Sequence, residues 1–197
     1  MNETAAREFT FSDRDFRRVC QLIYQRAGIA LADSKRDMVY SRLSRRLRTL
    51  GLRSFQDYLD QLERDGGDEW EAFTNALTTN LTSFFREPHH FEILLGHLRD
   101  RRDRAPLRIW CSAASTGEEP WSLAITACEA FNSLDPPVEI LATDIDTQVL
   151  ATGERAVYPL ERIKGLSTER ARKFFQRGTG PNEGMCRVKA PLRNLVR

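Results

Sequence analysis

The segment 107–120, LRIWCSAASTGEEP, constrains the fold of this 197-residue chain more than any other part of it. The apolar run from Leu107 to Trp110 predicts a strand, and the small residues after it predict a tight loop. Pro120 suits the first position of a helix, and the acidic Glu118 and Glu119 favour a helix N-terminus. Many α/β folds build a cofactor site from a strand, a loop and a helix N-terminus in this order.

The same loop restricts the ligand that such a site could bind. Gly117 is its only glycine, so it lacks the G-x-G-x-x-G and G-x-x-x-x-G-K patterns of dinucleotide and phosphate sites. Two carboxylates, Glu118 and Glu119, take the place where a phosphate would bind. We therefore expect a positively charged nucleoside without a pyrophosphate, such as S-adenosylmethionine. The alternative is an acidic helix cap that binds no ligand.

Residues 107–157 predict the first part of an α/β domain. We expect a helix over 121–131, a second strand over 138–143 and a helix from 147 to about 156, which make a right-handed βαβ unit. Asp144 follows the second strand, where an acid commonly accepts hydrogen bonds from ribose hydroxyls. The alternative is that Asp144 caps the next helix, a role that Asp146 or Thr147 could equally fill.

The first 100 residues show helical periodicity instead. Apolar spacing predicts helices over 12–28, from 33 or 34 to 51, over 54–64, over 68–77 and over 86–100. Ser12 and Asp15 have the spacing of a capping box. We expect an all-helical N-terminal domain at 1–86 and a helical linker at 87–106, which ends in the charged hinge RDRRDRAP.

The last forty residues predict an antiparallel β-subdomain at 158–197. We expect a short helix over 167–177, a turn at GTGPNEG (178–184), and short strands in MCRVK and LRNLVR.

A polar stretch, LTTNLTSFFREPHHF (77–91), interrupts the helical pattern. Short polar side chains compete with helical backbone hydrogen bonds and favour loops. One interpretation is a helix break with a surface arginine. The other is a loop over the cofactor, in which Arg86 pairs with a carboxylate of the cofactor or of a glutamate substrate.

The segment 34–53 carries seven basic residues and one acidic residue, a local charge of +6. A solvated helix face is one reading of this stripe, and docking to an acidic partner is another. Nucleic-acid binding is a third hypothesis, but no aromatic or glycine-rich reading surface accompanies the stripe. The candidate partner-binding residues are Arg42, Arg45, Arg46 and Arg48.

Composition narrows the remaining classes. The net charge of +2 gives no global field for nucleic acid, and no apolar run approaches the length of a membrane span. The four cysteines are widely spaced, which indicates reduced thiols and a cytoplasmic protein. With three histidines and no ligand spacing around them, we expect no metal site.

Four segments together resemble the CheR family of chemotaxis receptor methyltransferases: LTTNLTSFFREPHHFEIL, RIWCSAASTGEEPWSLAI, ILATDIDTQVL and FFQRGTGPNEG. The resemblance implies a helical N-terminal domain that docks on receptors, followed by a Rossmann-like S-adenosylmethionine-dependent domain with an inserted antiparallel β-subdomain. It also implies transfer of a methyl group to receptor glutamates, which leaves S-adenosylhomocysteine. By motif, Asn80, Thr82 and Arg86 would line the cofactor and active site, Glu119 would contact the cofactor, and Asp144 would bind the ribose.

The resemblance further implies the partners. These are the cytoplasmic helices of methyl-accepting chemoreceptors and, in some members, a peptide at the receptor C-terminus held by the β-subdomain. The family's later strands and motifs are missing after Arg197, so we expect an incomplete domain that transfers methyl groups poorly by itself. The competing hypothesis is a catalytically weak module that only binds receptors.

Overall fold

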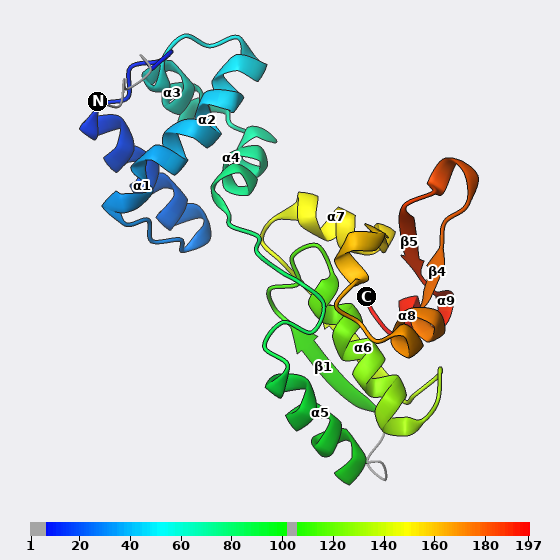
Figure 1. Ribbon diagram of the computed structural model, residues 1–197. Helices are drawn as coiled ribbons and strands as arrows, with labels where there is room; N and C mark the ends of the chain where they lie inside the picture. The colour runs from blue at the N-terminus through cyan, green and yellow to red at the C-terminus, as the bar shows by residue number, and fades with distance from the viewer. Residues whose placement is uncertain (1–6, 102–105) are drawn as a thin grey trace, which may run out of the picture. The chain divides into compact units, whose positions relative to one another are not determined.

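The computed structural model describes residues 7–101 and 106–197, and the expected charged hinge at 99–106 therefore lies partly outside the described residues. The chain divides into two compact units, Met1–Thr79 and Asn80–Arg197 (Figure 1). The division falls seven residues before the end of the helical domain expected from the sequence. Each unit has its own buried apolar cluster.

The first unit is all-helical, as expected. It contains α1 (Asp13–Ala27), the 3-10 helix η1 (Asp33–Lys35), α2 (Arg36–Leu50), α3 (Phe55–Asp65) and α4 (Glu69–Leu77). The apolar faces of the four α-helices form one core, whose fully buried members include Ile23, Leu43, Leu47, Phe55, Leu59 and Phe73.

Local signals set the ends of these helices. The Ser12 hydroxyl accepts from the Asp15 amide at 3.2 Å and the Asp15 carboxylate accepts from the Ser12 amide at 2.9 Å, which confirms the capping box. Gly28 and Gly51 end α1 and α2 in the left-handed conformation.

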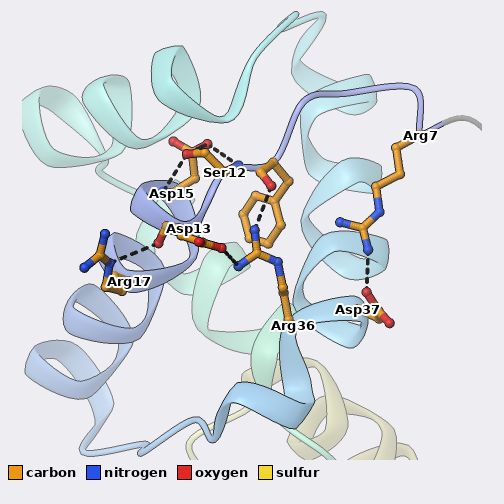
Figure 2. A network of polar contacts seen from close by, with 8 residues as sticks. Arg7, Ser12, Asp13, Asp15, Arg17, Arg36 and Asp37 are labelled. Carbon is orange, nitrogen blue, oxygen red and sulfur yellow. Dashed lines mark hydrogen bonds and ion pairs between the residues drawn. The ribbon is translucent and has the colours of Figure 1, made fainter.

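An arginine ties the chain before α1 to the start of α2. Arg36 donates to the Asp13 carboxylate at 2.6 Å and to the Phe11 carbonyl at 2.8 Å, and Arg7 pairs with Asp37 beside it (Figure 2). Two charges of the predicted basic segment, at 36 and 37, are thus used within the fold.

The second unit is built on a parallel strand pair. Strands β1 (Leu107–Cys111) and β2 (Val138–Ala142) pair in parallel with Leu107 opposite Val138, and α6 (Glu118–Phe131) connects them. Figure 1 shows α6 running along β1, and α5 (His89–Asp100) packs against α6. Leu98 of α5 is fully buried in the core of this unit, so the segment expected as a linker belongs to that core.

The predicted antiparallel excursion is present after α7 (Thr147–Arg155). Strands β3 (Val157–Pro159), β5 (Met185–Val188) and β4 (Phe175–Arg177) form an antiparallel sheet in the order β3-β5-β4. The connections are η3 (Leu160–Ile163), α8 (Thr168–Phe174) and η4 (Gly180–Asn182). The hairpin of β4 and β5 projects from the rest of this unit (Figure 1). The all-helical domain, the α/β domain and the inserted β-subdomain confirm the predicted fold class.

Three expected boundaries are wrong. The helix expected over 86–100 begins at His89, α6 begins at Glu118 instead of 120 or 121, and the helix expected over 167–177 ends at Phe174. Residues 175–177 form β4, because pairing with β5 outweighs the local helical pattern.

The largest correction concerns LRNLVR, which is not an antiparallel strand. Its first part lies in α9 (Ala190–Arg193), and Val196 then forms a parallel bridge with Ile140 of β2. The Ile140 amide donates to the Leu195 carbonyl at 2.8 Å, and the Arg197 amide donates to the Ile140 carbonyl at 3.0 Å. The chain therefore leaves the subdomain and returns to the parallel sheet beside β2.

Among the helices of the described residues, none is both long and apolar enough to cross a lipid bilayer.

Candidate functional site

The loop after β1 has a tightly defined backbone. Gly117 lies at φ +96°, and a Cβ atom there would come within 2.7 Å of the Tyr158 hydroxyl and 2.8 Å of the Gly153 Cα. The Tyr158 hydroxyl donates to the Thr116 carbonyl at 2.7 Å and accepts from the Trp121 indole at 2.9 Å. The loop is therefore held by a glycine that no other residue can replace without strain and by a buried tyrosine of β3.

Asp144 binds this loop directly. One oxygen of its carboxylate accepts from the Ser115 amide at 2.8 Å, and the other accepts from the Asp146 amide at 2.9 Å. An ionised carboxylate has about four acceptor sites, so lone pairs remain for ribose hydroxyls. The carboxylate is half-buried, which leaves it accessible to a ligand.

The alternative role for Asp144, the cap of α7, belongs to Asp146. The Asp146 carboxylate accepts from the amides of Gln148 and Val149 at 3.0 and 3.3 Å. Its second oxygen accepts from the Asn80 side-chain amide at 2.7 Å. The predicted residues Asn80 and Asp144 are thus joined through one intervening residue, Asp146, by its backbone amide and its carboxylate.

The segment 80–86 is an irregular turn that ends with Arg86. Phe85 and Glu87, on either side of Arg86, lie at φ 52° and 55°, a conformation that is costly for residues with side chains. The Phe85 amide donates to the Ser122 hydroxyl of α6 at 3.0 Å, and Arg86 donates to the Leu81 carbonyl at 3.1 Å. Arg86 is exposed, and it forms no ion pair with the residues that the structure describes. Its guanidinium remains available for a carboxylate.

The two glutamates at the start of α6 have different environments. Glu119 is exposed, whereas Glu118 is fully buried, receives a hydrogen bond from the Thr116 hydroxyl at 2.6 Å and pairs with Arg162. The expectation that both carboxylates face the ligand is wrong for Glu118, because its charge is neutralised inside the protein. Only Glu119 can approach a cationic ligand.

Cys111 is the last residue of β1, and its thiol donates to the Glu119 carboxylate at 3.5 Å. Burial raises the pKa of the Cys111 thiol to about 12, and the charge of Glu119 adds to the effect. Cys111 is therefore a neutral thiol near pH 7 and a poor nucleophile.

A cavity of about 690 Å³ adjoins the loop through Ala114, Ser115 and Gly117 and extends to α7 and the last residues of the chain. The predicted site residues do not line it. The buried Ser115 hydroxyl, which does line it, has no hydrogen-bond partner among the described residues. A ligand or water that reaches the loop from this side would meet an unused donor.

The predicted basic stripe divides into internal and exposed members. Arg42 donates to the carbonyls of Ala76 and Thr78 at the end of α4, and Arg46 binds the Glu69 carboxylate with two hydrogen bonds. Arg48 pairs with Glu8 at 2.8 Å, with both side chains more than half exposed. Arg45 is exposed, and its side chain has no hydrogen-bond or ion-pair partner within the described part of the chain. Arg42 and Arg46 hold the helical unit together, while Arg45 and Arg48 remain on its surface.

The second unit thus joins Asn80, Asp144 and the loop before Glu119 in one hydrogen-bonded network. Sequence reasoning missed Tyr158 and Arg162, which hold the loop and Glu118. No local signal could reveal them, because both act on residues more than 40 positions earlier in the chain.

Comparisons with known proteins match both units. The family model "CheR methyltransferase, all-alpha domain" matches residues 14–78, and "CheR methyltransferase, SAM binding domain" matches residues 80–197. A chemotaxis protein methyltransferase of Salmonella typhimurium is 55% identical over 186 residues, which cover 94% of this chain and 64% of that protein. Chemotaxis protein methyltransferase 2 of Pseudomonas aeruginosa is 54% identical over 190 residues, covering 96% of this chain and 68% of that protein. The Escherichia coli protein of the same kind is 52% identical over 186 residues. The chain spans 64% to 68% of the length of the first two relatives.

Proposed function

The chain belongs to the CheR methyltransferase family, and on this premise we propose that the whole protein methylates glutamate side chains of chemoreceptors. The methyl group comes from S-adenosylmethionine, and the products are glutamyl methyl esters and S-adenosylhomocysteine. The observation that carries the proposal is the network from Asn80 through Asp146 and Asp144 to Ser115. It brings together the three segments whose motifs would hold the cofactor.

The residues present fit this cofactor. Asp144 keeps acceptor sites for the ribose hydroxyls, and the exposed Glu119 carboxylate offers a counter-charge for a cationic group. Asn80 and Thr82 lie on the segment that leads to Arg86, whose guanidinium can bind a carboxylate with two parallel hydrogen bonds. A sulfonium nucleoside with an amino-acid tail carries the three groups that these side chains would bind: ribose hydroxyls, a positive charge and a carboxylate.

When bound, S-adenosylmethionine supplies an electrophilic methyl group, which moves to a carboxylate oxygen as the carbon–sulfur bond breaks and the electron pair remains on sulfur. A glutamate carboxylate has an ordinary pKa of about 4.3 and is already ionised near pH 7. The protein therefore needs no general base. Its contribution is alignment, which can supply on the order of 7 to 11 kcal/mol, and Arg86 orients a carboxylate without transferring a proton.

The receptor partner follows from the same reading. The helical unit docks on the cytoplasmic helices of a methyl-accepting receptor, and its exposed Arg45 and Arg48 face acidic side chains there. We place the reaction in the cytoplasm, where those receptor helices lie. The alternative of a receptor-binding module without catalysis is not favoured by the relatives, which are named methyltransferases.

A second receptor contact is a peptide at the receptor C-terminus. The antiparallel sheet borders a hollow of about 300 Å³ lined by Arg177, the turn after it, and Arg187 of β5. Strands β3 and β4 are the edges of this sheet, and an extended peptide can add to such an edge through main-chain hydrogen bonds. The two arginines would bind an acidic side chain or the terminal carboxylate.

The test is methyl transfer to a receptor cytoplasmic fragment from S-adenosylmethionine labelled in its methyl group. We expect label that base releases as volatile methanol, because a glutamyl methyl ester hydrolyses in base. A fragment with its acceptor glutamates replaced by alanine is the substrate control. Label that resists base, or equal labelling of the control fragment, contradicts the proposal.

Arg86→Met tests the site within the same assay. We expect a loss of roughly 100-fold in transfer, the effect of misaligned reactants. Arg155→Met, which changes an exposed arginine of α7, should keep full activity.

A further inference from the structure

Arg162 contacts two segments that carry the predicted site residues. It lies in η3, just after the first strand of the β-subdomain, and donates to the Glu118 carboxylate of α6 and to the Thr82 carbonyl at 3.2 Å. Glu118 precedes the ligand-facing Glu119, and Thr82 lies between Asn80 and Arg86. One guanidinium therefore joins the start of α6 to the middle of the segment 80–86.

The contact with Glu118 is strong. Glu118 is fully buried at the N-terminus of α6, where the helix dipole and the Thr116 hydroxyl also favour its charge. The Arg162 side chain is 42% exposed, so its solvent-facing side is hydrated while its other side reaches the buried carboxylate. Without Arg162, Glu118 would be a buried charge with no cationic partner, which proteins rarely tolerate.

The contact with Thr82 acts on the middle of the segment 80–86, in which the Phe84 ring is also buried against Tyr158 and Phe175. Asn80 is held at one end by Asp146, and the Phe85 amide is held near the other end by Ser122 of α6. Arg162 binds the carbonyl between these two points. Because the backbone near Arg86 is in a costly conformation, it depends on such contacts to persist.

We propose that Arg162 is a positioning residue for methyl transfer, which holds the segment 80–86 at the distance from α6 that lets both contact one cofactor. This inference rests on the proposed function and adds to it a role for the β-subdomain. The subdomain supplies Arg162 and Tyr158, and Tyr158 holds the loop before Glu118 through the Thr116 carbonyl. The subdomain is thus part of the methyl-transfer site as well as a surface for a receptor peptide.

The competing explanation is that Arg162 serves only as the counter-ion of Glu118. The two explanations differ for the double variant Arg162→Met, Glu118→Gln. Glutamine keeps an acceptor for the Thr116 hydroxyl and removes the buried charge, so the double variant should regain the stability that Arg162→Met loses. It does not restore the hydrogen bond to Thr82.

The experiment measures three quantities on the protein and its variants: stability in denaturant, affinity for S-adenosylhomocysteine by calorimetry, and amide hydrogen exchange of residues 82–86. For Arg162→Met we expect roughly tenfold weaker binding and roughly tenfold faster exchange, the loss of about one hydrogen bond to a charged group. In the double variant stability should return, while binding should stay weak and exchange should stay fast. Recovery of all three quantities would overturn the positioning role.

A matched control comes from the helical unit. Arg18 pairs with Asp60 at 2.6 Å and with Glu63, and its side chain is 28% exposed. Arg18→Met should lower stability without changing affinity or exchange at 82–86. If the unaltered protein binds no S-adenosylhomocysteine, the proposed function fails, while the exchange of 82–86 still decides whether Arg162 positions that segment.

Discussion

The Asn80 side-chain amide and the Asp146 carboxylate, 66 residues apart in the chain, are joined by a hydrogen bond of 2.7 Å. Asp146 is almost fully buried and at the same time caps α7 through its other oxygen. One carboxylate therefore fixes both the start of the segment 80–86 and the start of the helix after β2. The proposed cofactor-binding residues on these two elements therefore cannot move independently.

We predict that Asn80→Ala weakens S-adenosylhomocysteine binding and lowers the free energy of unfolding by about 1 to 2 kcal/mol, the usual effect of removing one partner of a buried acceptor. Titration calorimetry and urea denaturation measure the two effects. Gln148→Ala is the control, because it removes an exposed amide side chain from the same region. Equal behaviour of the two variants would show that the bond to Asp146 has no role.

The backbone of the loop after β1 gives a prediction about stability. Gly117→Ala should lower the free energy of unfolding by about 2 to 6 kcal/mol, since a positive φ and overpacking each cost about 1 to 3 kcal/mol. The new Cβ would lie 2.7 Å from the Tyr158 hydroxyl and 2.9 Å from the Trp121 indole nitrogen. Gly165→Ala, at a glycine with open space around it, should change stability little. A mild effect at Gly117 would mean that the loop can relax.

Local signals in the sequence predicted much of this fold. The capping box at Ser12, the helices that end at Gly28 and Gly51 and the two parallel strands depend on residues close together in the chain, so they could be read from it. The place of Asp144 in the fold could also be predicted, because this residue directly follows the end of the strand expected over 138–143.

Other features depend on partners that are distant in sequence. Glu118 looked like a ligand-facing acid, but its burial is set by Arg162, 44 residues later. The final residues looked like a subdomain strand, but Val196 pairs in parallel with Ile140. Local charge predicts Arg46 as a docking residue, but Arg46 binds Glu69 within the helical unit. Periodicity and local charge cannot reveal such pairings, because they are properties of the folded chain.

The basic face of α2 gives a prediction that separates docking from stability. Arg46 binds Glu69, which also accepts from the buried Tyr58 hydroxyl at 2.9 Å. Arg46→Met should therefore lower the free energy of unfolding by about 1 to 3 kcal/mol, the range for hydrogen bonds to charged groups. Arg45→Glu should change it by less than about 0.5 kcal/mol, as for most surface substitutions.

The effects on receptor binding should be reversed, with the larger loss in Arg45→Glu. Arg45→Glu should weaken binding to an acidic receptor fragment, and the loss should shrink as salt screens the charges. Denaturation curves and binding measured at two ionic strengths separate the two variants. An Arg45→Glu protein that binds the fragment normally at low salt would remove this face from the docking surface.

Two buried thiols make stability depend on pH above 9. Burial raises the pKa of Cys111 to about 12 and that of Cys128 to about 11, from an ordinary value of 9.0. In the folded protein the thiols keep their protons at pH values where the unfolded chain has released them. Their contribution is therefore complete below pH 9 and is lost as the pH rises through the folded values.

We expect the free energy of unfolding to fall steadily between pH 9 and about 11 to 12. Burial also raises the pKa of Tyr58 and Tyr158, so their hydroxyls add a loss of the same sign. Cys128→Ala separates the contributions. The variant should be less stable at pH 7, because its smaller side chain leaves a void in the core, yet its stability should decline less steeply above pH 9. Urea denaturation at several pH values gives both slopes. Equal slopes would mean that Cys128 titrates in the folded protein as it does in the unfolded chain.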